Sequence, residues 1–406
     1  MSKVIDTPQK LDHVAKQLSC AGVIAFDTEF IRESTFFPIV EIIQVATEAD
    51  AWIVDVRAFA DPKRLAGQKK TPDALRPLMD VFADKRVLKV GHALQGDQEC
   101  LLTSFGVIAS PGIDTAVAAS LCGYGDGIGL GNLLNAALEV SIKKGNARTD
   151  WSARPLPPQL VEYALADVTY LVVLWKKLEV EISRLERRDW AFELAARFED
   201  PAVYEPSAEV IAGRLSSGGR LDRKAYTALL GLVRWREERS RQLNLPRRWI
   251  ADDHVLTDIA RVRPKDIQHL GSFRGINKGE IKASGQMLLD VLREAEKPGS
   301  AALQPPREKR EKPPGDGESQ SMELLKCYVN ILAGHHKIAA RHLLLSEQLL
   351  PIIRSQAQTA EDLVREGLMS ARAGGLIGGE IVDLLRGRRA LSVSGGRVNL
   401  IDLLKS

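Results

Sequence analysis

Four carboxylates and one phenol have the type and spacing that chemistry requires. Asp27 and Glu29 follow the apolar run Val23–Phe26, and residues i and i+2 of a strand face the same side of a sheet. Asp97 follows a second apolar run, at 87–90, in the first turn of a predicted helix. Solvated acids at a strand end, or an acid beside a helix dipole, are the alternatives at these positions.

Asp167 is more informative, because it interrupts an apolar stripe. The pattern of the predicted helix 158–187 requires one more core position, at 167, among Leu160, Ala164, Leu171, Leu174 and Leu178. A charged carboxylate on a buried stripe is costly unless it is paired or bound to metal. Tyr163 lies one turn earlier and reaches the same patch. Pairing with an arginine, or capping of a neighbouring helix, is the structural alternative for Asp167.

Together the four carboxylates predict a metal centre at one end of a sheet. Two like charges about 4 Å apart repel by about 4 kcal/mol at an effective dielectric of about 20, so four ionised groups need compensation. Two divalent cations supply it, and hard oxygen ligands suit Mg²⁺ or Mn²⁺. Paired metals roughly 3.5–4 Å apart support in-line attack at a phosphodiester, one generating hydroxide and the other holding the leaving oxygen.

The elements that must position these groups are predicted from apolar periodicity. Three runs close in sequence predict an antiparallel meander: Val23–Phe26, Val40–Ala46 and Ala51–Val54. Further strands are predicted at 87–90 and within 108–113. Helical patterns follow at 73–84, 95–105, 114–122 and 158–187. This order indicates an α/β domain, a mixed sheet with helices on its faces, and Asp114 is predicted to cap a helix.

Charge divides the chain into two halves. Its 406 residues are 45% hydrophobic and 27% charged, which excludes collagen, coiled-coil and mostly disordered proteins. The net charge is only +3, yet residues 1–200 hold 23 basic and 28 acidic side chains, and residues 201–406 hold 33 and 25. An acidic first half is therefore joined to a basic second half.

Composition also predicts the domain order. Residues 1–200 are predicted to form the α/β domain and 207–296 to be all helical, with a long helix at 222–243 that Asp222 is predicted to cap. The Pro-, Gly- and charge-rich stretch 297–320 predicts a linker, and 321–406 is helical again with a hairpin-like tail. No apolar stretch is long enough for a signal peptide or a membrane span, and no CxxC pair occurs among the four cysteines. We therefore expect a cytoplasmic protein with reduced thiols and no membrane partner.

Several segments resemble one nuclease family. Three of them resemble the motifs of the DEDD superfamily of exonucleases: Asp27–Phe30, Gly91–Asp97 and Tyr163–Asp167. The tyrosine four residues before the last Asp is typical of the tyrosine-bearing branch, and within it the chain resembles the ribonuclease D family most. Other segments similar to that family are Phe36-Phe37-Pro38, Ile43-Gln44-Val45, Asp114-Thr115, Arg148–Trp151 and Arg154-Pro155-Leu156. Region 207–296 resembles the HRDC domain, on Leu232–Arg236 and Asn244-Leu245-Pro246, and 321–406 resembles a degenerate second copy.

The resemblance implies a ribonuclease H-like fold and 3′→5′ removal of mononucleotides from RNA. The substrates that it implies are tRNA precursors and other small structured RNAs, processed by a monomer. Asp27, Glu29, Asp97 and Asp167 match the metal ligands, and Tyr163 matches the residue that orients the attacking water. One departure is Ala93, where the wider superfamily often has an asparagine that contacts substrate.

Other residues are candidates for RNA contact, each with a plainer alternative. Phe30, Phe36 and Phe37 are suited to stacking a terminal base, or to core packing. His92 either replaces the missing asparagine or packs at a strand end. Lys143, Lys144 and Arg148 either grip phosphates or lie in a solvated loop. Region 207–297 holds 18 basic and 12 acidic residues, and its phosphate-binding candidates are Arg234, Arg236, Arg239, Arg241, Arg247 and Arg248, unless they form a solvated face with Glu237 and Glu238.

Two rival functions remain open from the sequence. One is a 3′→5′ exodeoxyribonuclease, because related domains trim DNA and HRDC modules accompany helicases, although no GxxxxGK[ST] motif occurs in this chain. The other is a non-catalytic RNA-binding protein, which the presence of all four acids and the tyrosine argues against.

Overall fold

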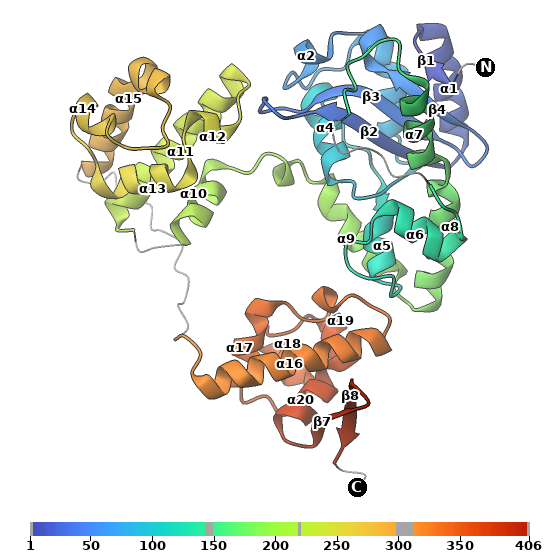
Figure 1. Cartoon of the computed structure of the whole chain (residues 1–406), viewed down its shortest axis with the longest axis vertical. Coiled ribbons are helices and arrows are strands. Elements are labelled where there is room, and N and C mark those ends of the chain that lie inside the picture. The colour runs from blue at the N-terminus through green and yellow to red at the C-terminus, as the bar shows by residue number, and fades with distance from the viewer. Residues whose placement is uncertain (1–2, 143–148, 218–220, 298–311, 404–406) are drawn as a thin grey trace.

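A computed structural model describes residues 3–142, 149–217, 221–297 and 312–403. The chain forms an α/β domain followed by two groups of helices (Figure 1). The first domain is built on a six-stranded sheet in the order β1-β4-β3-β2-β5-β6. Its strands are β1 (Val4–Ile5), β2 (Val23–Ile31), β3 (Ile39–Ala46), β4 (Ala51–Asp55), β5 (Leu88–Gly91) and β6 (Gly112–Asp114).

The sheet is mixed, as the sequence predicts. Strands β2, β3 and β4 form the antiparallel meander, while β1 pairs in parallel with β4, and β5 and β6 continue in parallel from β2. Strand β2 runs to Ile31 and is longer than the apolar run that predicts it. Asp27 and Glu29 therefore lie inside the strand, paired with Gln44 and Ile42 of β3.

Helices cover both faces of the sheet. Alternate residues of β2 point to opposite faces, so Ile24 and Phe26 belong to one hydrophobic core and Ala25 to another. The first core includes α1 (Pro8–Cys20), α3 (Arg76–Ala83) and α4 (Gln95–Phe105). The second includes α5 (Thr115–Ser120), α6 (Leu130–Leu138), α8 (Leu171–Arg184) and α9 (Arg188–Ala196).

The predicted helix 158–187 is divided into two. Helix α7 (Pro158–Thr169) contacts strands β2, β3 and β4, and α8 begins at Leu171. Tyr170 between them has a ψ of −5°, which ends the first helix and changes the direction of the chain. The apolar stripe therefore continues across a break, because its two halves pack against different parts of the sheet. Strand β1 was not predicted, since two residues carry no detectable period.

The second part of the chain is helical, as predicted. It contains α10 (Ala208–Ser217), α11 (Arg223–Leu243), α12 (Arg247–Ile250), α13 (Asp253–Val262), α14 (Ile267–Leu270) and α15 (Lys278–Glu296). Asp222 caps α11 by accepting a hydrogen bond from the Ala225 N–H at 2.7 Å, which confirms the predicted cap. Asn244 ends α11 in the left-handed region, with a φ of 49°.

The third part begins earlier than its composition predicts. Helix α16 (Asp316–His335) starts inside the stretch 297–320, where Glu318 accepts a hydrogen bond from Gly315 and pairs with Arg354. The helices that follow are α17 (Ser346–Arg354), α18 (Ala360–Arg365), α19 (Ala371–Ala373) and α20 (Gly379–Leu385). The predicted hairpin is formed by β7 (Arg389–Ser394) and β8 (Arg397–Asp402).

The third part packs on the α/β domain. The guanidinium of Arg187, which follows α8, donates to the carbonyl oxygens of Leu121, His336 and Lys337 at 2.7–2.9 Å. Residues of α5, α8 and α9 share one hydrophobic core with residues of α16–α20. The two parts are thus joined by apolar packing as well as by hydrogen bonds.

Candidate active site

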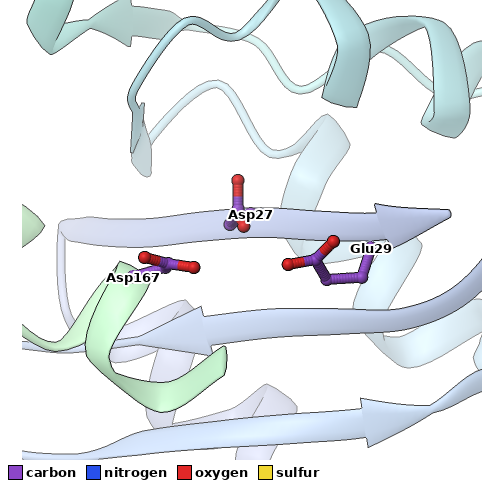
Figure 2. A group of neighbouring side chains, drawn as sticks. All are labelled: Asp27, Glu29 and Asp167. Atoms are coloured by element: carbon purple, nitrogen blue, oxygen red, sulfur yellow. The ribbon is translucent and has the colours of Figure 1, made fainter. Parts of the chain in front are cut away.

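Three of the predicted carboxylates converge. Asp27 and Glu29 project from the same face of β2, and Asp167 approaches them from α7 (Figure 2). One oxygen of each carboxylate can be chosen so that all three atoms lie within 4.8 Å of one another. This spacing lets one cation contact all three groups, and an all-oxygen donor set suits a hard divalent ion.

Asp97 lies beside this cluster but outside it. It stands in the first turn of α4, and its Oδ1 accepts hydrogen bonds from the Thr28 N–H at 2.9 Å and the Thr28 hydroxyl at 2.5 Å. Thr28 alternates with Asp27 and Glu29 along β2, so it faces α4 rather than α7. Asp97 is therefore held at the opposite side of the strand, close enough for its charge to raise the pKa of Asp27.

Burial and mutual repulsion make the carboxylates hard to ionise without a cation. Burial raises the pKa of Asp27 well above its ordinary value, and the charges of Asp97, Glu29 and Asp167 raise it further. Burial, followed by the charges of Asp167 and Asp97, raises the pKa of Glu29 to about 8. Burial raises the pKa of Asp97 to about 7 and that of Asp167 to about 6. A bound cation would relieve this repulsion, so the charge of the site fits a metal centre.

Two aromatic side chains border the cluster on the α7 side. Tyr163 lies one turn before Asp167, and hydrogen bonding from its phenol lowers the pKa of that carboxylate. The indole of Trp151 is 5% exposed, lies 6.1 Å from the Tyr163 ring, and lowers the pKa of Glu29 through a hydrogen bond. The phenol and the indole thus each face a different carboxylate.

Arg154 fixes the segment that carries Trp151. Its Nε and Nη2 bind the two oxygens of Asp55 at 2.8 and 2.6 Å, and Nη2 also donates to the Glu41 carbonyl at 3.2 Å. Its Nη1 donates to the carbonyl oxygens of Trp151 and Ala153 at 2.7 and 2.8 Å. These five hydrogen bonds match the five donors of a guanidinium, so the group joins the sheet to the loop before α7.

Asp114 holds the turn before α4. It caps α5 as predicted, accepting from the Ala116 N–H at 2.8 Å. The same carboxylate accepts from the N–H groups of Ala93 and Leu94 at 3.0 and 3.1 Å. Ala93 has a φ of 60°, a conformation that a non-glycine residue rarely adopts without such support. Asp114 therefore helps to place the start of the helix that carries Asp97.

His92 packs at the strand end. Its Nδ1 lies 2.9 Å from the Thr115 hydroxyl and its Nε2 lies 3.0 Å from the Ile128 carbonyl oxygen. Both ring nitrogens are thus engaged, and burial lowers the His92 pKa. Phe30 is half-buried against the core on the α4 side of the sheet. The structure therefore favours the packing alternative for both residues.

Phe36 lies at the contact between the first two domains. It is 8% exposed, and the guanidinium groups of Arg241 and Arg247 lie 5.4 and 4.6 Å from its ring centre. Its ring faces are therefore largely occupied, which argues against stacking of a terminal base there.

The predicted arginine patch is divided between exposed and internally paired side chains. Arg236 is 1% exposed and pairs with Asp253 at 2.6 Å, so its guanidinium is not available to RNA and its prediction as an RNA contact is wrong. Arg247 makes a two-pronged contact with Glu237 at 2.7 and 2.8 Å. Arg234 remains exposed, although it pairs with Glu209. Arg148, with Lys143 and Lys144, lies outside the described residues.

Sequence reasoning assigned no role to several residues beside the cluster. Gln44 donates to Asp27 at 3.4 Å and is fully buried on β3, where a polar residue between Ile43 and Val45 is a detectable signal. Gln44, Trp151 and Arg154 all lie in segments that resemble the family, but the resemblance gives none of them a role. Thr28 gave no signal, because its partner Asp97 is 69 residues away in sequence.

The comparisons with known proteins agree with this geometry. Residues 2–183 match a family model described as 3′-5′ exonuclease, and residues 228–292 match the HRDC domain model. Ribonuclease D of Acidiphilium cryptum is 31% identical over 402 residues, covering 98% of this chain and 97% of that protein. Ribonuclease D of Sphingobium indicum is 33% identical, covering 98% of each.

The chain belongs to the ribonuclease D family. The crystal structure of Escherichia coli RNase D, described as an exoribonuclease involved in structured RNA processing, superposes with a TM-score of 0.74 at 25% identity. The superposition covers 95% of this chain and 99% of that one. A protein from Bifidobacterium adolescentis shares the fold, with a TM-score of 0.59 at 18% identity over 95% of this chain and 96% of that one.

Family membership confirms the predicted fold class and the predicted class of enzyme, a 3′→5′ exoribonuclease. No helix among the described residues has both the length and the apolar character needed to cross a membrane.

Proposed function

We propose that this ribonuclease D family member trims RNA from its 3′ end with two divalent cations, Mg²⁺ or Mn²⁺. The observation that carries the proposal is the convergence of Asp27, Glu29 and Asp167 from two distant segments. Asp97, on the far side of Thr28, completes the proposed ligand set. When bound, the cations would activate water and stabilise the leaving oxygen of the phosphodiester.

The protein's own groups prepare this reaction. Asp97 and Gln44 flank the cluster, with Asp97 held by Thr28, so that the carboxylates meet a cation with little rearrangement. The hydroxyl of Tyr163 hydrogen-bonds to Asp167, and we propose that it orients the attacking water. Its pKa is raised by burial and by the neighbouring carboxylates, so the phenol stays protonated and acts as a hydrogen-bond donor.

We propose tRNA precursors and other small structured RNAs as substrates. Support comes from the similarity to Escherichia coli RNase D, whose description includes structured RNA processing. Exposed arginines of the HRDC region, Arg234 and Arg248 among them, are suited to the phosphates of such an RNA. The acidic first half of the chain then holds cations, and the basic second half contacts RNA.

We propose a division into an exonuclease domain at 1–200, an HRDC domain at 207–296, a linker, and a degenerate second HRDC domain. The last proposal is supported by the long opening helices α11 and α16, each followed by shorter helices. Because α16 begins at Asp316, the last domain starts before residue 321.

The experiment is the digestion of a tRNA precursor with an extended, 5′-labelled strand, in Mg²⁺, Mn²⁺ or chelator. The parent should shorten the RNA stepwise from the 3′ end only with metal. Asp167→Asn should abolish trimming while keeping the thermal unfolding midpoint close to the parent's. The matched control is Asp73→Asn, because the Asp73 side chain is 98% exposed and does not belong to the cluster.

Two results would contradict the proposal. Trimming by Asp167→Asn at the parent's rate would remove this carboxylate from the site. Faster trimming of a DNA strand of matched sequence would favour the exodeoxyribonuclease alternative.

A further inference from the structure

Two short segments, one from the exonuclease region and one from the HRDC region, are joined by hydrogen bonds in the structure. The turn after β2 carries Phe36 and Phe37, and Asn244 follows α11 of the HRDC region. The side-chain Oδ1 of Asn244 accepts hydrogen bonds from the backbone N–H of Phe36 at 3.1 Å and of Phe37 at 3.0 Å, across 208 and 207 residues. Figure 1 shows the end of the β2–β3 connection close to α12.

Both sides of this contact are fixed locally. Asn244 has φ and ψ of 49° and 45°, a left-handed conformation that asparagine tolerates better than most residues. On the other side, the Phe37 ring lies against Gly67, where an added Cβ would come within 2.4 Å of the ring. Phe36 is covered by Arg241 and Arg247, at distances typical of cation–π contacts.

A cavity of about 410 Å³ lies beside this contact, between the exonuclease and HRDC regions. Its charged lining consists of Arg32, Arg214, Arg236, Arg247, Glu99 and Asp253. Two of these arginines are balanced, since Arg32 pairs with Glu99 and Arg236 with Asp253. Arg247 pairs with Glu237, whereas Arg214 makes no ion pair with any residue that the structure describes.

The cavity is separated from the carboxylate cluster by α4. Gln95 and Glu99, which line the cavity, are four residues apart and share one face of the helix. Asp97 lies midway between them in sequence and so projects from the opposite face. A ligand in the cavity would therefore contact the protein away from the reacting bond.

We propose that Asn244 and the Phe36–Phe37 turn form an interdomain latch, and that the cavity beside it binds backbone phosphates of RNA upstream of the 3′ end. The proposal rests on the proposed function and deepens it. Arginine is the residue best suited to planar, multidentate contact with phosphate, and Arg214 lines the cavity with no acidic partner among the residues that the structure describes. Asn244 is then a positioning residue, because it acts by holding the HRDC arginines against the exonuclease domain.

The latch predicts a difference between short and long substrates. A dinucleotide reaches only the carboxylate cluster, whereas a hairpin RNA with a single-stranded 3′ tail extends to the cavity. Loss of the latch should therefore weaken binding of the hairpin RNA by about tenfold, within the range of 10–100-fold that corresponds to 1.4–2.8 kcal/mol. Turnover of the dinucleotide should stay unchanged.

The variants follow from the geometry of Asn244. Asn244→Gly removes Oδ1 and keeps the left-handed helix end, because glycine adopts that conformation freely. Asn244→Asp keeps an acceptor oxygen for both N–H groups and should restore hairpin binding. The matched control is Asn277→Gly, since Asn277 caps α15 within the HRDC region and accepts only from Gly279 there.

The role of Arg214 is tested by the salt dependence of hairpin RNA binding. Arg214→Gln should lower the slope of log affinity against log salt for the hairpin RNA by about 1, the value for one lost phosphate contact. Arg274→Gln should leave the slope unchanged, because Arg274 is exposed and does not line the cavity. The double variant Asn244→Gly/Arg214→Gln should bind hairpin RNA no more weakly than Asn244→Gly alone, because loss of the latch already removes the Arg214 contact.

Binding is measured by fluorescence anisotropy in chelator with the full chain, and folding by the thermal unfolding midpoint. Measuring binding in chelator separates the two proposals, because a parent that binds hairpin RNA in chelator but does not trim it when Mg²⁺ or Mn²⁺ is added overturns only the catalytic one. The latch is overturned if Asn244→Gly binds hairpin RNA like the parent, or if it loses dinucleotide turnover equally. Binding of RNA phosphates in the cavity is overturned if Arg214→Gln leaves the slope of log affinity against log salt for the hairpin RNA unchanged.

Discussion

Thr28 holds Asp97 through two hydrogen bonds to one carboxylate oxygen, one from its backbone and one from its hydroxyl. The pair joins the α4 side of the sheet to the strand that carries Asp27 and Glu29. Asp97 therefore owes its position to the residue that lies between the two acids.

Replacing Thr28 with valine should weaken this hold on Asp97 while keeping the shape of a side chain that is 5% exposed. The hydroxyl contact is a hydrogen bond to a charged group, which contributes about 1.5–3 kcal/mol. Thr28→Val should raise the Mg²⁺ concentration needed for half-maximal trimming about tenfold or more, and Thr28→Ser should restore the parent's value. Equal Mg²⁺ requirements in Thr28→Val and the parent would contradict a role for Thr28 in placing Asp97.

Tyr163→Phe should separate packing from chemistry. The ring contact with Trp151 is kept, while the hydroxyl beside Asp167 is lost. If the phenol orients the attacking water, kcat should fall by about 10²-fold or more, the range for a positioned proton donor or acceptor. The Mg²⁺ requirement should change little, and trimming at the parent's rate would remove Tyr163 from the reaction.

The metal-free protein should lose stability as pH rises. Glu29 and Asp167 have folded-state pKa values of about 8 and about 6, above their ordinary values of 4.5 and 3.8. Between these limits the folded state binds more protons than the unfolded state, so the free energy of unfolding falls with increasing pH. We expect the unfolding midpoint in chelator to decrease from about pH 4 to about pH 8.

Added Mg²⁺ should flatten this profile, because the cation compensates the ionised carboxylates. A midpoint in chelator that stays level or increases over the same range would contradict the electrostatic account. Asp73→Asn serves as the control, since Asp73 is an exposed carboxylate outside the cluster.

Arg154→Lys should disturb the site from a distance. A lysine ammonium has three donors and cannot reproduce the five hydrogen bonds to Asp55, Trp151, Ala153 and Glu41. We expect the free energy of unfolding, measured by denaturant titration, to fall by about 2–4 kcal/mol. Trimming should also be reduced. The control is Arg57→Lys, which changes the ion pair between Arg57 and Glu41 and leaves the hydrogen bonds of Arg154 to Trp151 and Ala153 in place.

Local periodicity explains which parts of the site could be predicted. Asp167 stands where the apolar stripe of its helix requires an apolar residue. A carboxylate at such a position indicates a functional site. The same periodicity in α11 predicts a buried position for Arg236, because this residue continues the buried series Leu229, Leu232 and Val233. The prediction of Arg236 as part of an exposed arginine patch overlooks this periodicity and is wrong.

Contacts between distant segments account for the rest. Asp97 and Thr28, Arg154 and Asp55, and Asn244 and Phe36 are each brought together only by the folded chain. In each pair, the local sequence around one residue does not indicate which distant residue it contacts. The strands and long helices, by contrast, followed from apolar runs and from caps such as Asp222.

Arg187 grips the C-terminal helices through the carbonyl oxygens of His336 and Lys337. Carbonyl oxygens are supplied by every amino acid, so replacing either side chain leaves these acceptors in place. Side chains at positions 336 and 337 can therefore change without loss of these hydrogen bonds to Arg187. The C-terminal helices can therefore differ widely in sequence and still dock on the catalytic domain in the same way.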